Sequence, residues 1–235
     1  MKKIYAFLYI LGLSTLFFVL QYDFDNDETS ESWNLPLTGK IIILDPGHGL
    51  PDRGADRDGI YESDIALSIA FKLRDYLQGQ GALVLLTREN EYDLAPKDLK
   101  GYSKRKVVDL KKRVELINTT GSELFISIHL NATTDTVSRG AVTFYTNKAE
   151  GSKRMAHFAQ DELARVLENT DRDEKVLNNV YILKKAEIPG VLVEVGFLSN
   201  KNERTLLNQD DYQDKVAFSI YNGTLRYFSN ENFKK

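Results

Sequence analysis

Three short apolar runs in this chain each lead to a side chain of a type that binds metal ions or transfers protons. The runs and these residues are Ile41–Leu44 with His48, Phe125–Ile128 with His129, and Val191–Val193 with Glu194. In an open α/β sheet the carboxyl ends of the strands converge on one crevice, so we expect the three side chains to meet there. Two imidazoles and nearby carboxylates in one crevice predict a catalytic zinc site.

Strand and helix patterns alternate from Lys40 onwards. The apolar periodicity predicts strands at 41–45, 83–87, 124–129, 140–146, 179–184 and 190–195. It predicts helices at 62–79, 107–118, 152–168 and 211–228, with a short one near 201–208. Such alternation indicates an α/β fold with helices on both faces of one sheet. The prediction is a three-layer α/β/α sandwich around a mostly parallel, mixed sheet of about six strands.

Composition limits the partners and the metal ligands. The 235 residues are 42% hydrophobic, which suits one globular domain of roughly 200 residues with a full core. The net charge of −3 gives no polyanion-binding signature, so no nucleic-acid partner is expected. The chain has no cysteine, so a zinc site must use histidines and carboxylates.

The N-terminal residues are typical of an export segment. Lys2 and Lys3 precede an uncharged run from Ile4 to Leu20, and no small-x-small cleavage site follows. Residues 1–20 are therefore predicted to be a membrane anchor or signal segment, and the missing cleavage site favours an uncleaved anchor. The lysines would stay inside, which places the remainder of the chain outside the cytoplasm. Residues 21–39 are predicted to be an acidic linker, and residues 40–235 one domain.

A third zinc ligand is needed beside His48 and His129, because catalytic zinc takes three protein ligands and leaves one position for water. Glu62 is the best candidate, since it follows a glycine-containing loop that can return it to His48. Each histidine taken alone has a structural alternative, as a hydrogen-bonded residue of the scaffold. His157 lies within a helical pattern and is predicted to be structural.

Glu194 is the candidate general base, because a carboxylate at the end of a buried strand is partly desolvated and its pKa rises. The alternative is an ordinary strand-end contact. Asp45 is predicted either to orient an imidazole or to hold the turn. Asn131 is predicted either to fix the loop after His129 or to donate to a substrate carbonyl. The lysine-rich segment 89–106 is either a solvated loop and helix start or a rim that attracts anionic polymer or peptide carboxylates.

The ordered motifs resemble those of the zinc-dependent N-acetylmuramoyl-L-alanine amidases of the amidase-3 type. They are Asp45-Pro46-Gly47-His48-Gly49, Glu62, Ser127-Ile128-His129-Leu130-Asn131, and Val193-Glu194-Val195-Gly196-Phe197-Leu198-Ser199-Asn200. The resemblance runs from about Lys40 to Tyr227 and implies an α/β/α sandwich. It implies that His48, Glu62 and His129 bind Zn²⁺ and that Glu194 is catalytic. Leu50 departs from the pattern, in which a second glycine is common.

Within that family, the chain resembles the germination-specific amidases of the spore cortex. This implies hydrolysis of the amide between the muramic acid lactyl group and L-alanine in peptidoglycan. It also implies a place in cortex maturation, in the forespore or cortex space, where a partner muramic acid deacetylase completes muramic δ-lactam formation. Two alternatives stay open: a zinc exopeptidase that acts on free peptides, and an inactive wall-binding protein.

Overall fold

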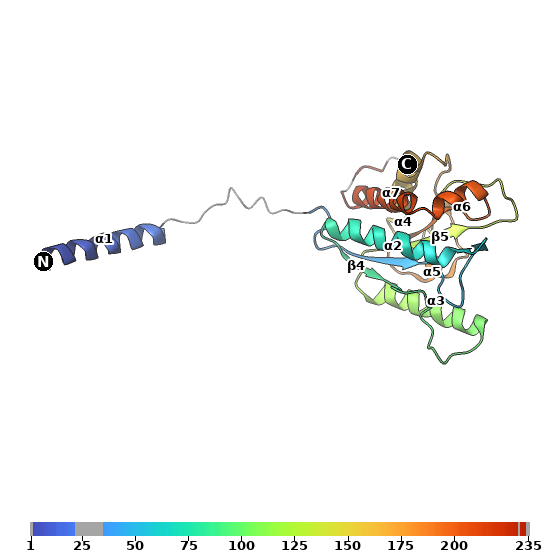
Figure 1. Ribbon diagram of the computed structural model, residues 1–235, viewed down its shortest axis with the longest axis horizontal. Coiled ribbons are helices and arrows are strands. Elements are labelled where there is room, and N and C mark those ends of the chain that lie inside the picture. The colour runs from blue at the N-terminus through green and yellow to red at the C-terminus, as the bar shows by residue number, and fades with distance from the viewer. Residues whose placement is uncertain (1, 22–34, 230, 234–235) are drawn as a thin grey trace. The chain divides into compact units, whose positions relative to one another are not determined.

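The computed structural model describes residues 2–21, 35–229 and 231–233, and the chain divides into two units, Met1–Asn34 and Leu35–Lys235 (Figure 1). The first unit contains helix α1 (Lys2–Gln21), whose described side chains are exposed. Within the described part of the chain, we find no helix with the length and apolar character needed to cross a membrane. Residues 22–34 of the predicted linker lie outside the described residues. The second unit begins at Leu35, and Leu37 is fully buried in its core.

One six-stranded sheet organises the second unit. Its strand order is β4-β1-β5-β8-β6-β7, and β6 runs antiparallel to β8 while the other neighbours are parallel. The strands are β1 (Ile41–Pro46), β4 (Leu83–Leu86), β5 (Leu124–Asn131), β6 (Val142–Tyr145), β7 (Lys175–Val176) and β8 (Gly190–Phe197). The parallel strands β1, β5 and β8 lie side by side, which brings their carboxyl ends to one edge, as the sequence predicted.

Helices cover both faces of this sheet and confirm the predicted three-layer sandwich (Figure 1). On one face lie α2 (Glu62–Gly79), α4 (Ser152–Leu167) and α7 (Asp210–Phe228), with α6 (Lys201–Leu207) leading into α7. On the other face lie α3 (Tyr102–Thr119) and α5 (Tyr181–Lys185).

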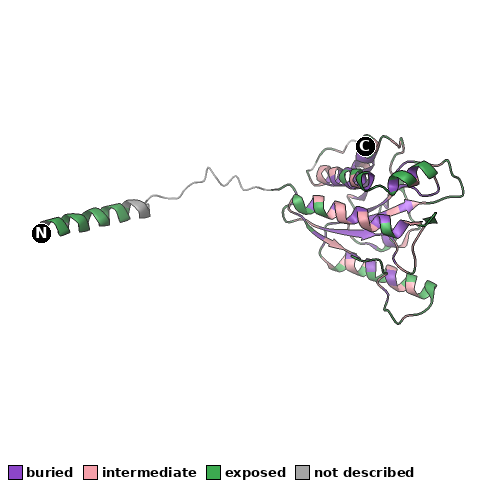
Figure 2. Cartoon of the chain, in the orientation of Figure 1, coloured by how far each residue is buried: buried purple, intermediate pink, exposed green. Residues whose placement is uncertain are grey.

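The side chains of each strand alternate between two hydrophobic cores, one on each face of the sheet. In β1, Ile42 and Leu44 join the core under α2, whereas Ile43 joins the smaller core under α3 and α5. Successive side chains of a strand point to opposite faces, so a strand covered on both sides is apolar along most of its length. Figure 2 shows the resulting concentration of buried residues in the sheet.

One predicted element has the wrong type, and another has the wrong first residue. Residues 179–184 were predicted to be a strand, but Tyr181–Lys185 form helix α5, and the sixth strand is the two-residue β7. Helix α3 begins at Tyr102 rather than at residue 107, directly after Gly101, whose φ is 95°. A small antiparallel hairpin, β2 (Asp56–Arg57) with β3 (Ile60–Tyr61), lies in the loop before α2 and was not predicted.

Candidate metal centre and active site

His48 projects from the turn that follows β1. Its φ is 60°, in the left-handed region, so the turn reverses sharply after Gly47. A side chain at position 47 has no room, because a Cβ there would lie 2.4 Å from the ring of His129. The glycine therefore permits the backbone of one strand end to approach the imidazole of its neighbour, and the two histidine ring centroids lie 5.1 Å apart.

A buried ionic network holds this turn from below. Arg113 of α3 donates to Asp45 Oδ1 at 2.8 Å and to Asp109 Oδ2 at 2.9 Å. Its guanidinium also donates to the carbonyls of Pro46 and His48. Burial alone would raise the pKa of Asp45, but the charge of Arg113 and the hydrogen bonds from Ser127 and Thr87 together outweigh burial and lower it. Asp45 therefore stays ionised and fixes the turn through Arg113.

Asp45 was predicted either to orient an imidazole or to hold the turn, and its contacts support the second role. Its Oδ2 accepts from Ser127 at 2.6 Å and its Oδ1 from Thr87 at 2.7 Å. Among the described contacts of Asp45, none is a hydrogen bond to an imidazole. Arg88 adds to the same support, because it donates to the Pro46 carbonyl at 3.0 Å.

Glu62 is the first residue of α2 and is buried. Its Oε2 accepts from the backbone N–H of Ala55 at 2.8 Å, and its Oε1 accepts from the N–H of Leu130 at 3.0 Å. Gly54 packs directly on it, since a Cβ there would lie 2.5 Å from Glu62 Oε2 and 2.7 Å from the ring of His48. Loop and strand together fix the position of the carboxylate.

His48, Glu62 and His129 converge as the sequence predicted. Glu62 Oε1 lies 3.2 Å from His48 Nε2 and 2.9 Å from His129 Nδ1. One ligand atom from each residue falls within 4.8 Å of the other two. Two imidazole nitrogens and one carboxylate oxygen form the donor set that zinc takes in catalytic sites with two histidines and a glutamate. The residues present therefore fit a zinc ion.

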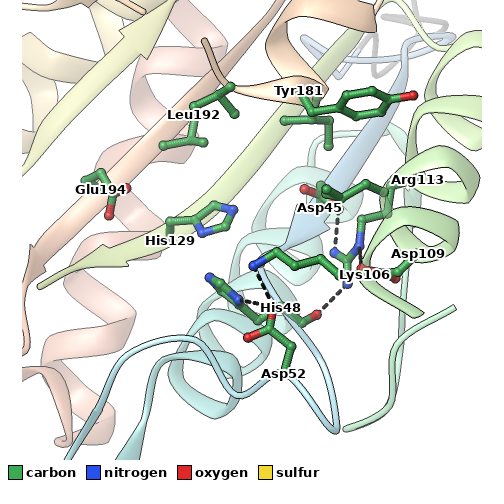
Figure 3. Close-up of a pocket in the computed structure, with 14 residues that line it drawn as sticks. Asp45, His48, Asp52, Lys106, Asp109, Arg113, His129, Tyr181, Leu192 and Glu194 are labelled. Atoms are coloured by element: carbon green, nitrogen blue, oxygen red, sulfur yellow. Dashed lines mark hydrogen bonds and ion pairs between the residues drawn. The ribbon is translucent and has the colours of Figure 1, made fainter. Parts of the chain in front are cut away.

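Asp52 orients His48 from the side away from Glu62, and the sequence reasoning did not assign it a role. Its Oδ2 lies 3.1 Å from His48 Nδ1 and 2.9 Å from Lys106 Nζ (Figure 3). An acceptor at Nδ1 leaves Nε2 to face the cluster. The available signal was an aspartate four positions after the histidine, in the same loop.

The charges around His48 favour its protonated form in the metal-free site. Burial opposes this charge, but hydrogen bonds and charge from Asp52 and Glu62 outweigh it and raise the pKa of His48 to about 9. Burial opposes ionisation of Asp52 and Glu62 as well, but their partners hold both pKa values far below the usual range. The partners are His48 and Lys106 for Asp52, and His129 and His48 for Glu62. A metal ion that binds here at neutral pH therefore displaces a proton from His48.

Glu194 lies beside the cluster of His48, Glu62 and His129, and its surroundings differ from those of these three residues. It lies opposite His129 in the register of β5 and β8, and Figure 3 shows His129 between Glu194 and His48. Its Oε2 is shielded from solvent and has no hydrogen-bond partner among the described residues. Burial raises the pKa of Glu194 to about 7, because the opposing charge of His129 is weaker than the loss of hydration.

A pocket of about 250 Å³ opens beside these residues. Its lining includes His48, His129 and Glu194 on the sheet side, and Lys106 on the α3 side. The wall between them contains Leu110, Val180, Tyr181, Ile182 and Leu192. Helix α5, where a strand was predicted, thus forms part of the pocket wall.

Two further sequence candidates lie away from the pocket lining. The backbone carbonyl of Asn131 accepts from the N–H of Leu198 at 2.8 Å, which joins the ends of β5 and β8. Because the backbone makes this contact, the role of the Asn131 side chain stays a prediction. His157 lies 3.3 Å from Glu174 and packs against Phe158 and Phe233, in the surroundings of a scaffold residue.

The family model described as N-acetylmuramoyl-L-alanine amidase matches residues 42–226. The chain belongs to the N-acetylmuramoyl-L-alanine amidase family. A protein named germination-specific N-acetylmuramoyl-L-alanine amidase, from Bacillus subtilis (strain 168), is 51% identical over 228 residues, which cover 97% of this chain and 96% of that protein. The chain is accordingly an enzyme, an amidase of this family, as the resemblance of the motifs implied.

Solved structures show the same relationship. The CwlD amidase from Clostridioides difficile, solved in complex with the GerS lipoprotein, is 41% identical with a TM-score of 0.79 and covers 81% of this chain and 98% of its own. An N-acetylmuramoyl-L-alanine amidase from Clostridium difficile 630 is 31% identical with a TM-score of 0.72, covering 82% of this chain and 98% of its own.

Proposed function

We propose that this amidase is zinc-dependent and hydrolyses the amide bond between the muramic acid lactyl group and L-alanine in peptidoglycan. The observation that carries this proposal is the cluster of His48, Glu62 and His129, whose ligand atoms lie within 4.8 Å of one another beside the carboxylate of Glu194. The names of the relatives support the substrate.

His48, Glu62 and His129 would hold the zinc ion. When bound, zinc supplies a Lewis acid that polarises the scissile carbonyl and acidifies the attacking water. Asp52 fixes the tautomer of His48, and the N–H of Ala55 and of Leu130 fix the carboxylate of Glu62. The chain thus presents three oriented ligands and leaves the open side of the cluster to the pocket.

Glu194 is the proposed general base and acid. It takes a proton from the attacking water, and it gives a proton to the alanine nitrogen as the amide bond breaks. In the metal-free site, burial raises the pKa of Glu194 to about 7, and a carboxyl with a raised pKa protonates a leaving nitrogen more readily than an ordinary one. Its unpartnered Oε2 leaves the acceptor available for this transfer.

The proposed setting is the spore cortex. Cleavage leaves a free lactyl carboxylate on muramic acid, and this group forms a δ-lactam once a partner deacetylase has exposed the neighbouring amine. The printed name of the Bacillus subtilis relative, a germination-specific amidase, supports this role. Export to the forespore or cortex space, by an N-terminal segment that anchors the chain or is cleaved, is supported by Lys2 and Lys3 before an uncharged run.

The two alternatives are less well supported by the site. An exopeptidase generally holds the terminal carboxylate with an arginine, and the arginine of this pocket, Arg113, is buried and bonded to Asp45 and Asp109. An inactive wall-binding protein needs neither three convergent ligands nor an unpartnered glutamate beside them.

Mass spectrometry of digested peptidoglycan tests the proposal. The purified full chain, loaded with zinc, is incubated with intact glycan strands and separately with free stem peptides. We expect glycan with peptide-free muramic acid and released peptides that begin with L-alanine. Shortened free peptides with untouched glycan would indicate an exopeptidase, and no cleavage by a zinc-loaded chain would indicate a binding protein.

A further inference from the structure

Lys106 is the cation of the pocket that remains open to a ligand. The two basic residues in the pocket lining, apart from the histidines, are Lys106 and Arg113. The side chain of Arg113 is 2% exposed, and its donors bind carboxylates and backbone carbonyls. The side chain of Lys106 is 44% exposed and extends from α3 towards His48 and Asp52 (Figure 3).

Lys106 has one hydrogen-bond acceptor among the described residues, which leaves two of its donors for a ligand. The ammonium group has three donors, and Asp52 Oδ2 accepts one of them at 2.9 Å. Asp52 is itself shared, because the same oxygen faces His48 Nδ1 and its Oδ1 accepts from the N–H of Gly54. An ion pair with this degree of exposure is weak, so Lys106 can share its charge with an incoming anion.

The dimensions of the pocket favour the peptide over the glycan. A glycan strand continues in both directions and needs an open groove, whereas a pocket of about 250 Å³ accepts a short peptide segment. Leu110, Ile182 and Leu192 supply apolar walls for that segment, and Lys106 is the accessible cation of this lining as far as the structure describes it.

We propose that Lys106 binds the free carboxylate of the second stem-peptide residue, the one that follows the L-alanine of the scissile amide. This inference rests on the proposed amide hydrolysis and names the part of the substrate that the pocket selects. A second residue joined through its side-chain carboxyl keeps its α-carboxylate free, and that anion matches an ammonium group. The pocket lining has four carboxylates. Asp45 and Asp109 are paired with Arg113, Asp52 is paired with Lys106 itself, and Glu194 lies beside the metal cluster.

The distances agree with this assignment. Asp52 Oδ2 lies 3.1 Å from His48 Nδ1 and 2.9 Å from Lys106 Nζ, so this one oxygen bridges the two nitrogens. An extended dipeptide spans at most roughly 7 Å. A stem peptide whose first amide lies at the cluster therefore brings the carboxylate of its second residue to Lys106, whereas a third residue extends beyond it.

A pair of substrates that differ in one group tests the proposal. Two tetrasaccharide fragments carry the stems L-alanyl-D-isoglutamate and L-alanyl-D-isoglutamine, so a carboxylate is compared with its neutral amide. For the zinc-loaded full chain we expect kcat/KM to be about tenfold higher for the carboxylate, the effect of one partly exposed charged hydrogen bond. In Lys106→Met the ratio should fall to about one, and in Lys106→Arg it should remain.

The controls separate this role from a structural one. Lys104 lies two residues earlier on α3, is exposed, and is outside the pocket lining, so Lys104→Met should keep the wild-type ratio. If Lys106 acts only by supporting Asp52, Lys106→Met will lower kcat/KM for both substrates and leave their ratio unchanged, which overturns the proposal. Equal rates on both substrates in the wild type also overturn it, although the proposed function stands. Cleavage of neither substrate contradicts the proposed function itself.

Discussion

The turn that carries His48 and the strand end that carries Glu194 lie on two sides of one cluster, and they differ in how their polar atoms are paired. Beneath His48, the backbone carbonyls and carboxylates are bonded to Arg88 and Arg113. Glu194 Oε2, by contrast, has no partner within the described part of the chain. The surroundings of His48 hold its turn in a fixed position, whereas the surroundings of Glu194 leave its carboxylate free to exchange protons.

The two tasks of the site, metal binding and proton transfer, therefore require opposite surroundings. A metal ligand must be held in one orientation, which neighbouring hydrogen bonds provide. A general base near neutral pH must have a raised pKa, which burial without a partner provides. Substitutions on the two sides should therefore fail in different ways.

The largest effect is expected from the ligands themselves. Wild type should bind about one zinc ion per chain, and His48→Ala or His129→Ala should lose it, because two remaining ligands do not complete a catalytic site. Metal analysis after dialysis measures the loss, and His157→Ala is the matched control because His157 lies outside the cluster. Full zinc content in either variant would contradict the proposed ligand set.

Removal of the support beneath His48 should destabilise the fold. Arg113→Met leaves Asp45 and Asp109 buried without their cation, which typically costs about 3–5 kcal/mol in the free energy of unfolding. Urea denaturation of the metal-free protein measures this cost. Arg165→Met removes an ion pair of an arginine whose side chain is 60% exposed, and we expect a change below about 1 kcal/mol. Similar values for the two variants would show that the network does not support the turn.

Asp52 should affect the metal without being a ligand. Asp52→Asn removes the charge that orients His48 Nδ1, and losses of such partners typically weaken metal binding by about 10–100-fold. Asp58→Asn is the control, because Asp58 lies in the same loop but is paired with Arg204. Zinc competition with a chromophoric chelator measures both affinities. Unchanged affinity in Asp52→Asn would remove Asp52 from the metal site.

The smallest predicted effect is the release of one proton when zinc binds. With the pKa of His48 raised to about 9 in the metal-free site, zinc binding below this pH displaces one proton. Zinc affinity should therefore rise about tenfold per pH unit between pH 7 and 8.5 and level off near pH 9. A constant affinity over this interval would show that His48 is already neutral.

Linkage gives the matching effect on the stability of the metal-free fold. The pKa of His48 is higher in the folded protein than its ordinary value of 6.5. Protonated His48 therefore contributes its full stabilisation of the fold below pH 6.5. That contribution is lost as the pH rises through about 9.

The sequence predicted the residues of the cluster better than their surroundings. Ile41–Leu44, Phe125–Ile128 and Val191–Val193 are buried strands because they are apolar apart from Ser127, and parallel neighbours bring the residues after them to one edge. Glu62 was predicted because a loop with three glycines can fold back, and Gly54 does lie against it. These features depend on residue type and order, which a sequence shows directly.

The errors occurred where short segments take their structure from tertiary contacts. The run that contains Tyr181 and Ile182 has the composition of a strand, yet it forms a short helix packed on α3. A short apolar run does not distinguish the two by periodicity. The first turn of α3 is polar and lacks an apolar period, so its start was placed too late. The contacts of Asp52 with His48 and Lys106 depend on how loop and helix meet, and spacing alone does not show this.

The most direct test of the contrast between the two sides is Glu194→Gln. This change keeps the size of the side chain and removes the group that accepts a proton. We expect wild-type zinc content, because His48, Glu62 and His129 remain, and a loss of turnover on peptidoglycan of about 10²–10⁴-fold. Loss of zinc together with activity would make Glu194 a ligand. Retained zinc with near-normal turnover would contradict its role as the proton-transfer group.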